Sequence, residues 1–554
     1  MLKSIVAIFL FGLLFLGTKA QEANPEIKVN TIANLDGADT VIFIGETVPD
    51  ATIEGLPTLT EELKVLSKLH PKFTTHMQVY VPETIGATVK RLIFAGTGPL
   101  ASDTADSRNI YDAASKATSL AYVSGPKDGT QKILIIVDPA LVDNTVAWRS
   151  KDLLDLNAAL GALYALYKPK EIRELPGDNP KKMKYYELYI FKATDDVITW
   201  AKYIEEGRWV ARDICGGDPE TMNTENIMKY INDSAKFSTV EVKVLDILKE
   251  SHPLVAAVNR GSEKIPRHNG RILQLTYTNG NPTKAAYFAG KGVTLDTGGL
   301  DLKISNTMVG HHRDKCGAAA IIGFFKTLEF VKPTNVKFMA NLAILRNNLG
   351  SSSYSTDEIL MARSGKRIKI GFTDAEGRLL VSDLVNEVMD EALTDNIDDK
   401  MTDIYSVGTY TEHVTKMYKF ITGAIENGVA RKAGVLDSLQ KSSELLSDPL
   451  EITLLRREDY TFNVGPLETE DLRNSNPGKD VSTQRGSQVA AAFIIQASGM
   501  EEHGRGTENP LRFVHLDVTG SVGDGDTVPT ASPLTLLATH YLLPETLKSP
   551  TSKN

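Results

Sequence analysis

Short runs of β-branched residues alternate with Ala- and Leu-rich stretches in the first third of the chain. We predict strands over residues 41–44, 91–95 and 133–137, and a helix over residues 153–167. Parallel strands need a long crossover between them, which is usually a helix, so this alternation favours a mostly parallel sheet covered by helices. The first third therefore predicts an α/β domain.

The second half of the chain repeats this alternation. Predicted strands cover residues 272–278, 285–290, 336–345 and 513–518, and predicted helices cover residues 318–328 and 379–392. At 554 residues the chain is long enough for more than one domain. A polar, proline-containing stretch at 174–184 is the best linker candidate, and a helix over 200–215 would follow it into a second domain.

These observations predict an α/β protein of two unequal domains. We expect a smaller N-terminal α/β domain over residues 21–190 and a larger C-terminal α/β domain over residues 191–545. The larger domain should have a central mixed sheet flanked by helices. Residues 546–554 are expected to be a disordered tail.

The first 20 residues differ in composition from the rest. Lys3 precedes an apolar run over residues 5–16, and Thr18 and Ala20 lie three and one positions before a cut that would follow Ala20. This layout is typical of a secretory signal peptide. An uncleaved membrane anchor is the weaker alternative, because the run is shorter than the roughly 20 residues that span a bilayer as a helix. We therefore expect a secreted, extracellular protein that begins at Gln21.

The balance of charge argues against two classes of partner. The chain has 61 Lys and Arg residues and 70 Asp and Glu residues, which gives a formal net charge of −9 at pH 7. A net negative charge disfavours binding to nucleic-acid phosphates and to anionic lipid. We expect no nucleic acid and no membrane among the partners, and a small molecule or a peptide as the substrate.

The chain has two cysteines, Cys215 and Cys316. One disulfide is compatible with an oxidising compartment, but separation in sequence does not determine separation in space. We predict two free, buried thiols.

Four carboxylates lie where strands end in glycines and helices begin: Asp296, Asp314, Asp374 and Glu376. This is the usual place for binding sites in open α/β sheets. Carboxylates that converge there repel one another unless cations lie between them, and oxygen-rich sites of this kind suit a pair of divalent metal ions. The pattern indicates a dinuclear metal site.

Each carboxylate taken singly has a simpler interpretation. An Asp at the start of a helix caps backbone N–H groups, and an acidic loop residue is stable in water, so neither needs a metal ion. The metal interpretation depends on the whole group, together with Lys291, Lys303 and Arg378.

These residues stand in three motifs: Gly290-Lys-Gly-Val-Thr-Leu-Asp-Thr-Gly-Gly-Leu-Asp-Leu-Lys303, Arg313-Asp-Lys-Cys-Gly-Ala-Ala319 and Thr373-Asp-Ala-Glu-Gly-Arg378. Arg512-Phe-Val-His-Leu-Asp517 is a fourth. In these motifs the chain closely resembles the leucyl (cytosol) aminopeptidase family of dinuclear metallopeptidases, over most of residues 195–540. Glu220-Thr-Met-Asn-Thr224 and Arg363-Ser-Gly-Lys366 resemble its "probable aminopeptidase-like" branch.

The resemblance implies a ligand role for five residues. Asp296 and Glu376 would bridge two divalent ions, Lys291 and Asp314 would complete the tighter site, and Asp374 would complete the more exchangeable one. Carboxylates with one amine suit Zn or Mn, and also Mg or Co, so the identity of the metal stays open. A lysine ligand must be neutral, and a bound cation lowers its pKa.

The resemblance also implies catalytic groups, a substrate and an assembly. Lys303 would polarise the scissile carbonyl and the oxyanion that forms from it, and Arg378 would hold a bicarbonate that acts as general base. Relatives of this kind remove N-terminal residues from peptides and form homo-hexamers. We therefore expect a catalytic C-terminal domain and a hexamer.

The chain departs from the family pattern around the expected substrate. His311 takes the place of a Met that lines the side-chain pocket, so we expect its ring to face the first residue of the substrate. The other departures are Phe372, Lys315, the segment 405–409 and the pair Arg346-Asn347. They keep an alternative open: a catalytically impaired family member that serves as an extracellular structural or binding protein.

Overall fold

The computed structural model describes residues 27–548, except for 84, 86–87, 127–129, 175–185, 306, 396, 398–400 and 475–482. The predicted signal peptide and residues 549–554 of the predicted tail lie outside the described residues. Helix α17 (Glu545–Lys548) includes the first three residues of that predicted tail.

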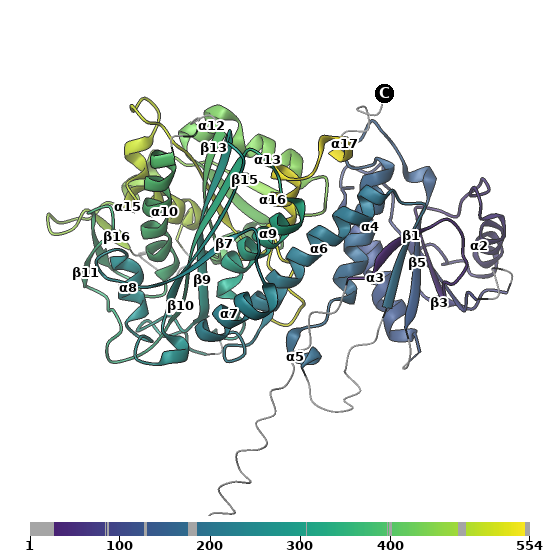
Figure 1. Ribbon diagram of the computed structural model, residues 1–554, viewed down its shortest axis with the longest axis horizontal. Coiled ribbons are helices and arrows are strands. Elements are labelled where there is room, and N and C mark those ends of the chain that lie inside the picture. Colours follow the sequence, from purple (N-terminus) through teal and green to yellow (C-terminus); the bar gives the residue numbers. More distant parts are fainter. Residues whose placement is uncertain are drawn as a thin grey trace, which may run out of the picture.

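A six-stranded sheet forms the centre of the N-terminal part (Figure 1). Its strand order is β1-β6-β5-β2-β4-β3, and every neighbouring pair is parallel except β3 with β4. The strands are β1 (Val29–Ile32), β2 (Thr40–Gly45), β3 (Val79–Tyr80), β4 (Arg91–Gly96), β5 (Gln131–Val137) and β6 (Tyr186–Phe191). The predicted, mostly parallel α/β arrangement is confirmed.

Helices cover both faces of this sheet. Alternate residues of β2 point to opposite sides, so Val41 and Phe43 pack with α2 (Pro57–Leu69) on one face. Ile42 and Ile44 pack with α3 (Arg108–Ser124) and α4 (Lys151–Leu166) on the other. A short helix, α5 (Lys170–Arg173), follows α4.

The C-terminal part contains an eight-stranded mixed sheet, which confirms the predicted architecture. Its order is β15-β14-β17-β13-β9-β10-β8-β7, and the central strand β9 is parallel to both of its neighbours. The strands are β7 (Glu241–Asp246), β8 (Arg271–Asn279), β9 (Lys284–Asp296), β10 (Val336–Asn347), β13 (Thr402–Gly408), β14 (Thr422–Glu426), β15 (Leu450–Thr453) and β17 (Arg512–Asp517). A separate small sheet is formed by β11 (Ile359–Met361), β12 (Arg367–Ile370) and β16 (Leu472–Asn474).

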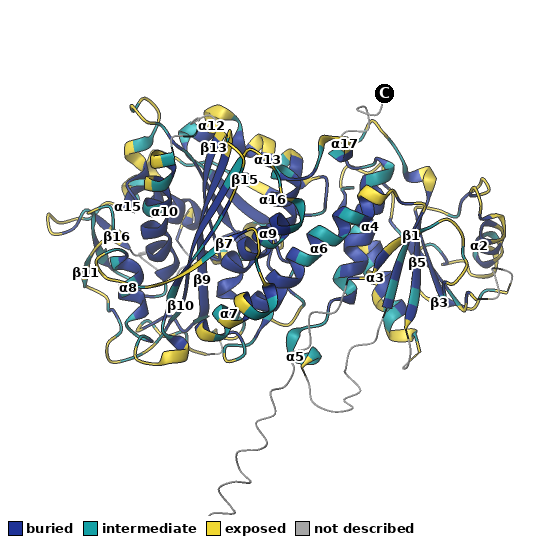
Figure 2. Cartoon of the chain, viewed as in Figure 1, coloured by how far each residue is buried: buried dark blue, intermediate teal, exposed yellow. Residues whose placement is uncertain are grey.

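The central strands of the large sheet are buried on both faces, whereas the edge strand β7 is exposed (Figure 2). One face packs against α6 (Asp195–Gly216), α9 (Cys316–Val331) and α16 (Leu534–Tyr541). The other packs against α8 (Pro253–Asn259), α10 (Glu376–Asp395) and α15 (Gly486–Ala497). The remaining helices are α7 (Thr224–Tyr230), α11 (Glu412–Tyr418), α12 (Gly428–Ala433), α13 (Val435–Ser443) and α14 (Arg457–Phe462). No helix of the described part of the chain has the length and apolar character needed to cross a bilayer.

Helix α6 joins the two sheets. Its apolar side shares one continuous core with α4 of the first part and α9 of the second, and Figure 1 shows it between them. The expected linker at 174–184 lies almost wholly outside the described residues. The strand that follows it, β6, still pairs with β1 and β5 of the first sheet, so the chain leaves that sheet only after Phe191.

The prediction of two free thiols is wrong. Cys215 and Cys316 form a disulfide with their Cα atoms 4.5 Å apart. The pairing follows from the packing of α6 on α9, which brings the end of one helix to the start of the other across a sequence separation of 101 residues. A contact of this kind is invisible in the sequence.

Candidate metal centre

Strand β9 carries a lysine in the middle of an apolar run. Lys291 is 4% exposed and lies between β10 and β13. Its side chain passes between two glycines: a Cβ on Gly377 would lie 2.8 Å from the lysine Cδ, and a Cβ on Gly408 would lie 2.7 Å from its Cβ. Any larger residue at these two positions would therefore close the path of the lysine.

The ammonium group of Lys291 meets two buried carboxylates. Its Nζ lies 2.7 Å from Oδ1 of Asp314 and 2.7 Å from Oε1 of Glu376, and it donates a hydrogen bond of 2.7 Å to the carbonyl oxygen of Thr409. The hydroxyl of Thr409 donates to the same Asp314 oxygen at 2.5 Å. Lys291 is thus the cation that lies among these acids.

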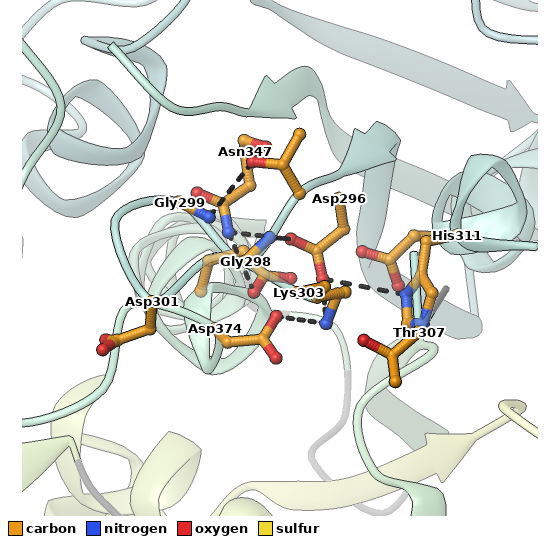
Figure 3. Close-up of polar contacts among 12 residues, drawn as sticks. Asp296, Gly298, Gly299, Asp301, Lys303, Thr307, His311, Asn347 and Asp374 are labelled. Carbon is orange, nitrogen blue, oxygen red and sulfur yellow. Dashed lines mark hydrogen bonds and ion pairs between the residues drawn. The ribbon is translucent and has the colours of Figure 1, made fainter. Parts of the chain in front are cut away.

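Asp296 ends β9, and Asn347 ends the neighbouring strand β10 (Figure 3). The Nδ2 of Asn347 donates to Oδ1 of Asp296 at 2.8 Å and to Oε2 of Glu376 at 3.4 Å. The backbone N–H of Gly298 donates to the same oxygen of Asp296 at 2.9 Å. One buried amide therefore orients two carboxylates that come from separate elements.

Lys303 lies on the other side of Asp296. Its Nζ is 3.0 Å from Oδ2 of Asp296 and also forms an ion pair with Asp374. Figure 3 shows the ammonium group between these two carboxylates. The loop after β9 therefore brings a second cation to the acids.

The turn that carries Asp374 and Glu376 is held from three directions. Thr373 donates its backbone N–H to Asp301 at 2.7 Å, and its carbonyl oxygen accepts from the Tyr354 hydroxyl at 2.5 Å. Asn474 donates to the carbonyl oxygens on either side, those of Phe372 at 3.2 Å and Ala375 at 3.3 Å. These bonds fix the backbone from which both acids project.

The charges in this group shift one another's pKa. Burial raises the pKa of Glu376 and of Asp374, and the charge of Asp296 raises both further. Burial would also raise the pKa of Asp296, but the charges of Lys303 and Lys291 outweigh it and hold that pKa below its ordinary value. For Lys291 burial favours the neutral amine, but the charges of Asp314 and Glu376 outweigh it and raise its pKa. The acids crowd together more closely than the two lysines can fully compensate.

The donor set fits a divalent cation. Asp296, Asp314 and Glu376 each offer an oxygen, and these oxygens lie within 4.8 Å of one another in a buried position. The second oxygen of Asp314 is buried and accepts no hydrogen bond from the described residues. Buried carboxylate oxygens without a donor are costly unless a cation compensates them. Asp374 is outside this tight group and reaches it through Lys303.

Two further predicted residues lie close to the acids. His311 is partly exposed, with Nδ1 3.9 Å from Oδ2 of Asp296, and burial together with the charge of Lys303 lowers its pKa. Arg378 is buried in the first turn of α10, and its charge adds to burial in lowering the pKa of His515 to about 3. The structure therefore joins seven of the predicted site residues through direct contacts near the carboxyl end of β9, and Arg378 follows Glu376 by two residues in α10.

Two of the departures from the family pattern do not surround a substrate. Lys315 is fully buried and turns away from the acids, donating to the carbonyl oxygen of Gly217 at 2.9 Å. Tyr405 stacks on Phe288 in the core, and only the end of its segment, Thr409, reaches the acids. Positions adjacent to site residues in sequence point to opposite faces of a strand or turn, which the sequence alone does not resolve.

Comparison with known proteins agrees with this arrangement. Residues 209–538 match the model of the cytosol aminopeptidase family, catalytic domain. The chain belongs to the cytosol aminopeptidase family. It is therefore a metallopeptidase of that family, and the family uses divalent metal ions.

Named relatives span most of the chain. "Putative aminopeptidase W07G4.4" of Caenorhabditis elegans is 35% identical over 461 residues, which cover 82% of this chain and 85% of the relative. "Probable cytosol aminopeptidase" of Chlamydia muridarum is 27% identical over 66% of this chain and 68% of its own length. The protein of the same name in Chlamydia felis is 26% identical over 78% and 80%. The similarity therefore extends beyond the site motifs.

Several residues that build the site were missed as such in the sequence. The sequence marks Asn347 only as part of a departure near the expected substrate, yet its side chain donates hydrogen bonds to Asp296 and Glu376. Asp301, Tyr354 and Asn474 carried no signal except that Asp301 lies within the first motif. They act through backbone groups of the turn 371–376, and such contacts depend on tertiary packing.

We predict that Asn347→Ala weakens metal binding. The change removes the donor shared by Asp296 and Glu376, and loss of such a supporting hydrogen bond typically costs 10- to 100-fold in metal affinity. Isothermal titration of the purified chain with Mn²⁺ measures it. Asn348→Ala is the matched control, because its side chain is not bonded to the acids. Equal affinity in the two variants would contradict the prediction.

Proposed function

We propose that this chain is a metal-dependent aminopeptidase that hydrolyses N-terminal residues from peptides at a dinuclear divalent site. The observation that carries the proposal is the buried group of Asp296, Asp314 and Glu376, in which Lys291 bridges Asp314 and Glu376 while Lys303 pairs with Asp296. We assign the activity to a C-terminal domain over residues 191–545, and residues 21–190 to a separate N-terminal domain. The end of β6 at Phe191 supports this boundary.

Five residues would hold the ions. We assign Asp296 and Glu376 as bridges, Lys291 and Asp314 to the tighter position and Asp374 to the more exchangeable one. Two divalent ions there would lower the pKa of water and polarise a carbonyl group. Lys291 has to give up its proton to act as a ligand, and the positive charge of the ions favours that loss. Zn or Mn fits this set, and so do Mg and Co.

Lys303 and Arg378 supply the remaining charge. Burial lowers the pKa of Lys303, but the charges of Asp296 and Asp374 outweigh it, so the side chain stays an ammonium group that can donate to the carbonyl oxygen of a substrate. A donor fixed by two carboxylates needs no reorganisation when negative charge develops on that oxygen. Arg378 is a buried cation suited to a small anion, and we assign it a bicarbonate that accepts a proton.

A second candidate is a family member that binds metal but has lost turnover and serves as an extracellular structural or binding protein. The position of His311 favours this second candidate, because its imidazole Nδ1 lies 3.9 Å from Oδ2 of Asp296, a proposed bridging carboxylate. Both candidates require the metal site. They differ only in whether bound substrate is hydrolysed.

We predict two ions per chain after loading with Mn²⁺ or Zn²⁺, and hydrolysis of aminoacyl amides. Glu376→Ala should lose both ions and lower kcat/KM by about 100-fold or more, whereas Asp374→Ala should lose mainly one ion. Metal analysis and an amide screen measure these effects. Asp357→Asn is the control, because its carboxylate is 85% exposed and pairs with Lys369 rather than with the residues of the centre.

The outcomes of this experiment separate the candidates. Absence of bound metal in the unchanged chain would contradict the site. Two bound ions with no turnover on any amide would favour the structural or binding role.

We predict that small or polar N-terminal residues are preferred over Leu, and that His311→Met shifts the preference towards Leu by about tenfold. A polar group left unpaired beside an apolar side chain costs about 1–3 kcal/mol. A Met side chain at the same position carries no such cost, because it is apolar. The measurement is kcat/KM for Leu, Met, Ala, Ser and Arg amides. His312→Met is the control, and unchanged ratios in His311→Met would show that His311 does not contact the substrate side chain.

We propose that the chain is secreted and begins at Gln21 in its mature form. The signal-peptide pattern of residues 1–20 supports this, and so does the Cys215–Cys316 disulfide, since disulfides persist mainly in oxidising compartments. We predict that secreted material lacks residues 5–16, and N-terminal sequencing of the medium fraction checks it. Recovery of those residues would contradict cleavage. The homo-hexameric state stays a prediction from the family resemblance.

A further inference from the structure

The segment that carries Asp314 is joined covalently to helix α6. Cys316 is the second residue after Asp314, and it forms a disulfide with Cys215 in the last turn of α6. Both cysteines are 2% exposed, and the chain has no others. The one covalent cross-link available to this sequence therefore lies beside a proposed metal ligand.

The chain reaches the turn that carries Asp314 from an exposed loop. The loop after β9 is exposed at Ile304 and Val309, and Gly310 then turns the chain at a φ of +88°. A single 3-10 turn, His311–Lys315, connects this glycine to α9. The disulfide lies on the opposite, carboxyl side of Asp314.

Polar contacts join the same segment to its surroundings. Lys315 donates to the carbonyl oxygen of Gly217, two residues beyond Cys215, at 2.9 Å. Arg313 donates to the carbonyl oxygens of Gly523 at 3.0 Å and Gly525 at 3.2 Å. Among these contacts the disulfide alone is covalent, whereas each hydrogen bond can be replaced by a hydrogen bond to water.

Helix α6 is a firm support for this cross-link. Its buried Arg212 pairs with Glu205 at 2.6 Å and donates to the carbonyl oxygen of Pro529 at 3.1 Å. Gly207 of α6 packs against the backbone of Gly323 in α9, where a Cβ would lie 2.5 Å from the glycine oxygen. Close packing of α6 on α9 thus holds in place the helix to which Cys316 is joined.

We propose that the Cys215–Cys316 disulfide fixes Asp314 and thereby sets the affinity of the centre for one of its two ions. The two cysteines are positioning residues, and their oxidation completes the site. In that step the two thiols form one S–S bond, and two electrons and two protons pass to a disulfide oxidant, which becomes two thiols. The inference rests on the proposed function, because it takes Asp314 as a metal ligand.

The test is the affinity of the full mature chain, freed of metal with a chelator, for Mn²⁺ in isothermal titration. The unchanged chain should bind two ions. Cys215→Ala/Cys316→Ala should bind one ion with unchanged affinity and the other at least tenfold more weakly. Asp314→Asn should show the same loss, and adding the two cysteine changes to Asp314→Asn should weaken binding no further, because the disulfide acts through that carboxylate.

The control for a general loss of stability is Leu134→Ala. Leu134 is a buried residue of β5 in the first sheet. This variant should have a lower Tm but unchanged affinity for both ions. If the double cysteine variant does not fold, the unchanged chain is reduced with a dithiol under native, metal-free conditions, its thiols are counted, and it is titrated in the same way.

The outcomes separate the two claims. Equal affinity for both ions with and without the disulfide would overturn this inference and leave the proposed function standing. Two tightly bound ions in Asp314→Asn would overturn the ligand assignment on which both depend.

Discussion

A buried cation among buried carboxylates is the constraint on which the rest of this structure depends. Lys291 lies between Asp314 and Glu376 at 2.7 Å from each, inside a strand that is almost wholly buried. Removing one partner of a buried ion pair typically costs about 3–5 kcal/mol, because the remaining charge is left without compensation. The strand with Lys291, the turn with Asp314 and the helix with Glu376 must therefore meet at one point if their charges are to compensate one another.

The α/β architecture supplies that point. In a sheet whose central strands are parallel, strand ends and helix starts gather at one edge, and Asp296, Asp314 and Glu376 all lie there. The exact positions of the carboxylates are then set by side chains that donate hydrogen bonds to the backbone around them. Asn474 from β16 holds the turn before α10, although β16 belongs to a different sheet.

The departures from the family pattern fall into two groups once their positions are known. His311 lies beside the acids, where we propose that it lines the substrate pocket. Lys315 instead points towards the end of α6, beside the disulfide of Cys316 that connects the centre to the helix linking both sheets. Neighbouring residues of one short segment thus face different parts of the molecule: His311 the acids, and Lys315 and Cys316 the end of α6.

The sequence by itself determined the fold class and most of the candidate site. The alternation of strands and helices was sufficient for two α/β units, since it depends on local periodicity. The motifs placed the carboxylates of the candidate site correctly in one group, because Asp296, Asp314 and Glu376 each lie close in sequence to a strand end or a helix start. The strand expected at 336–345 was also found, but its insertion between β8 and β9 was not foreseen.

Only the tertiary structure decided how distant residues meet. Asn347, Asn474 and Tyr354 act on the site through contacts between elements that are far apart in the chain, and the Cys215–Cys316 pair spans 101 residues. The prediction of free thiols was wrong for the same reason. A sequence pattern reports which face a residue occupies within its own element, whereas helix packing and strand order determine what lies opposite that face.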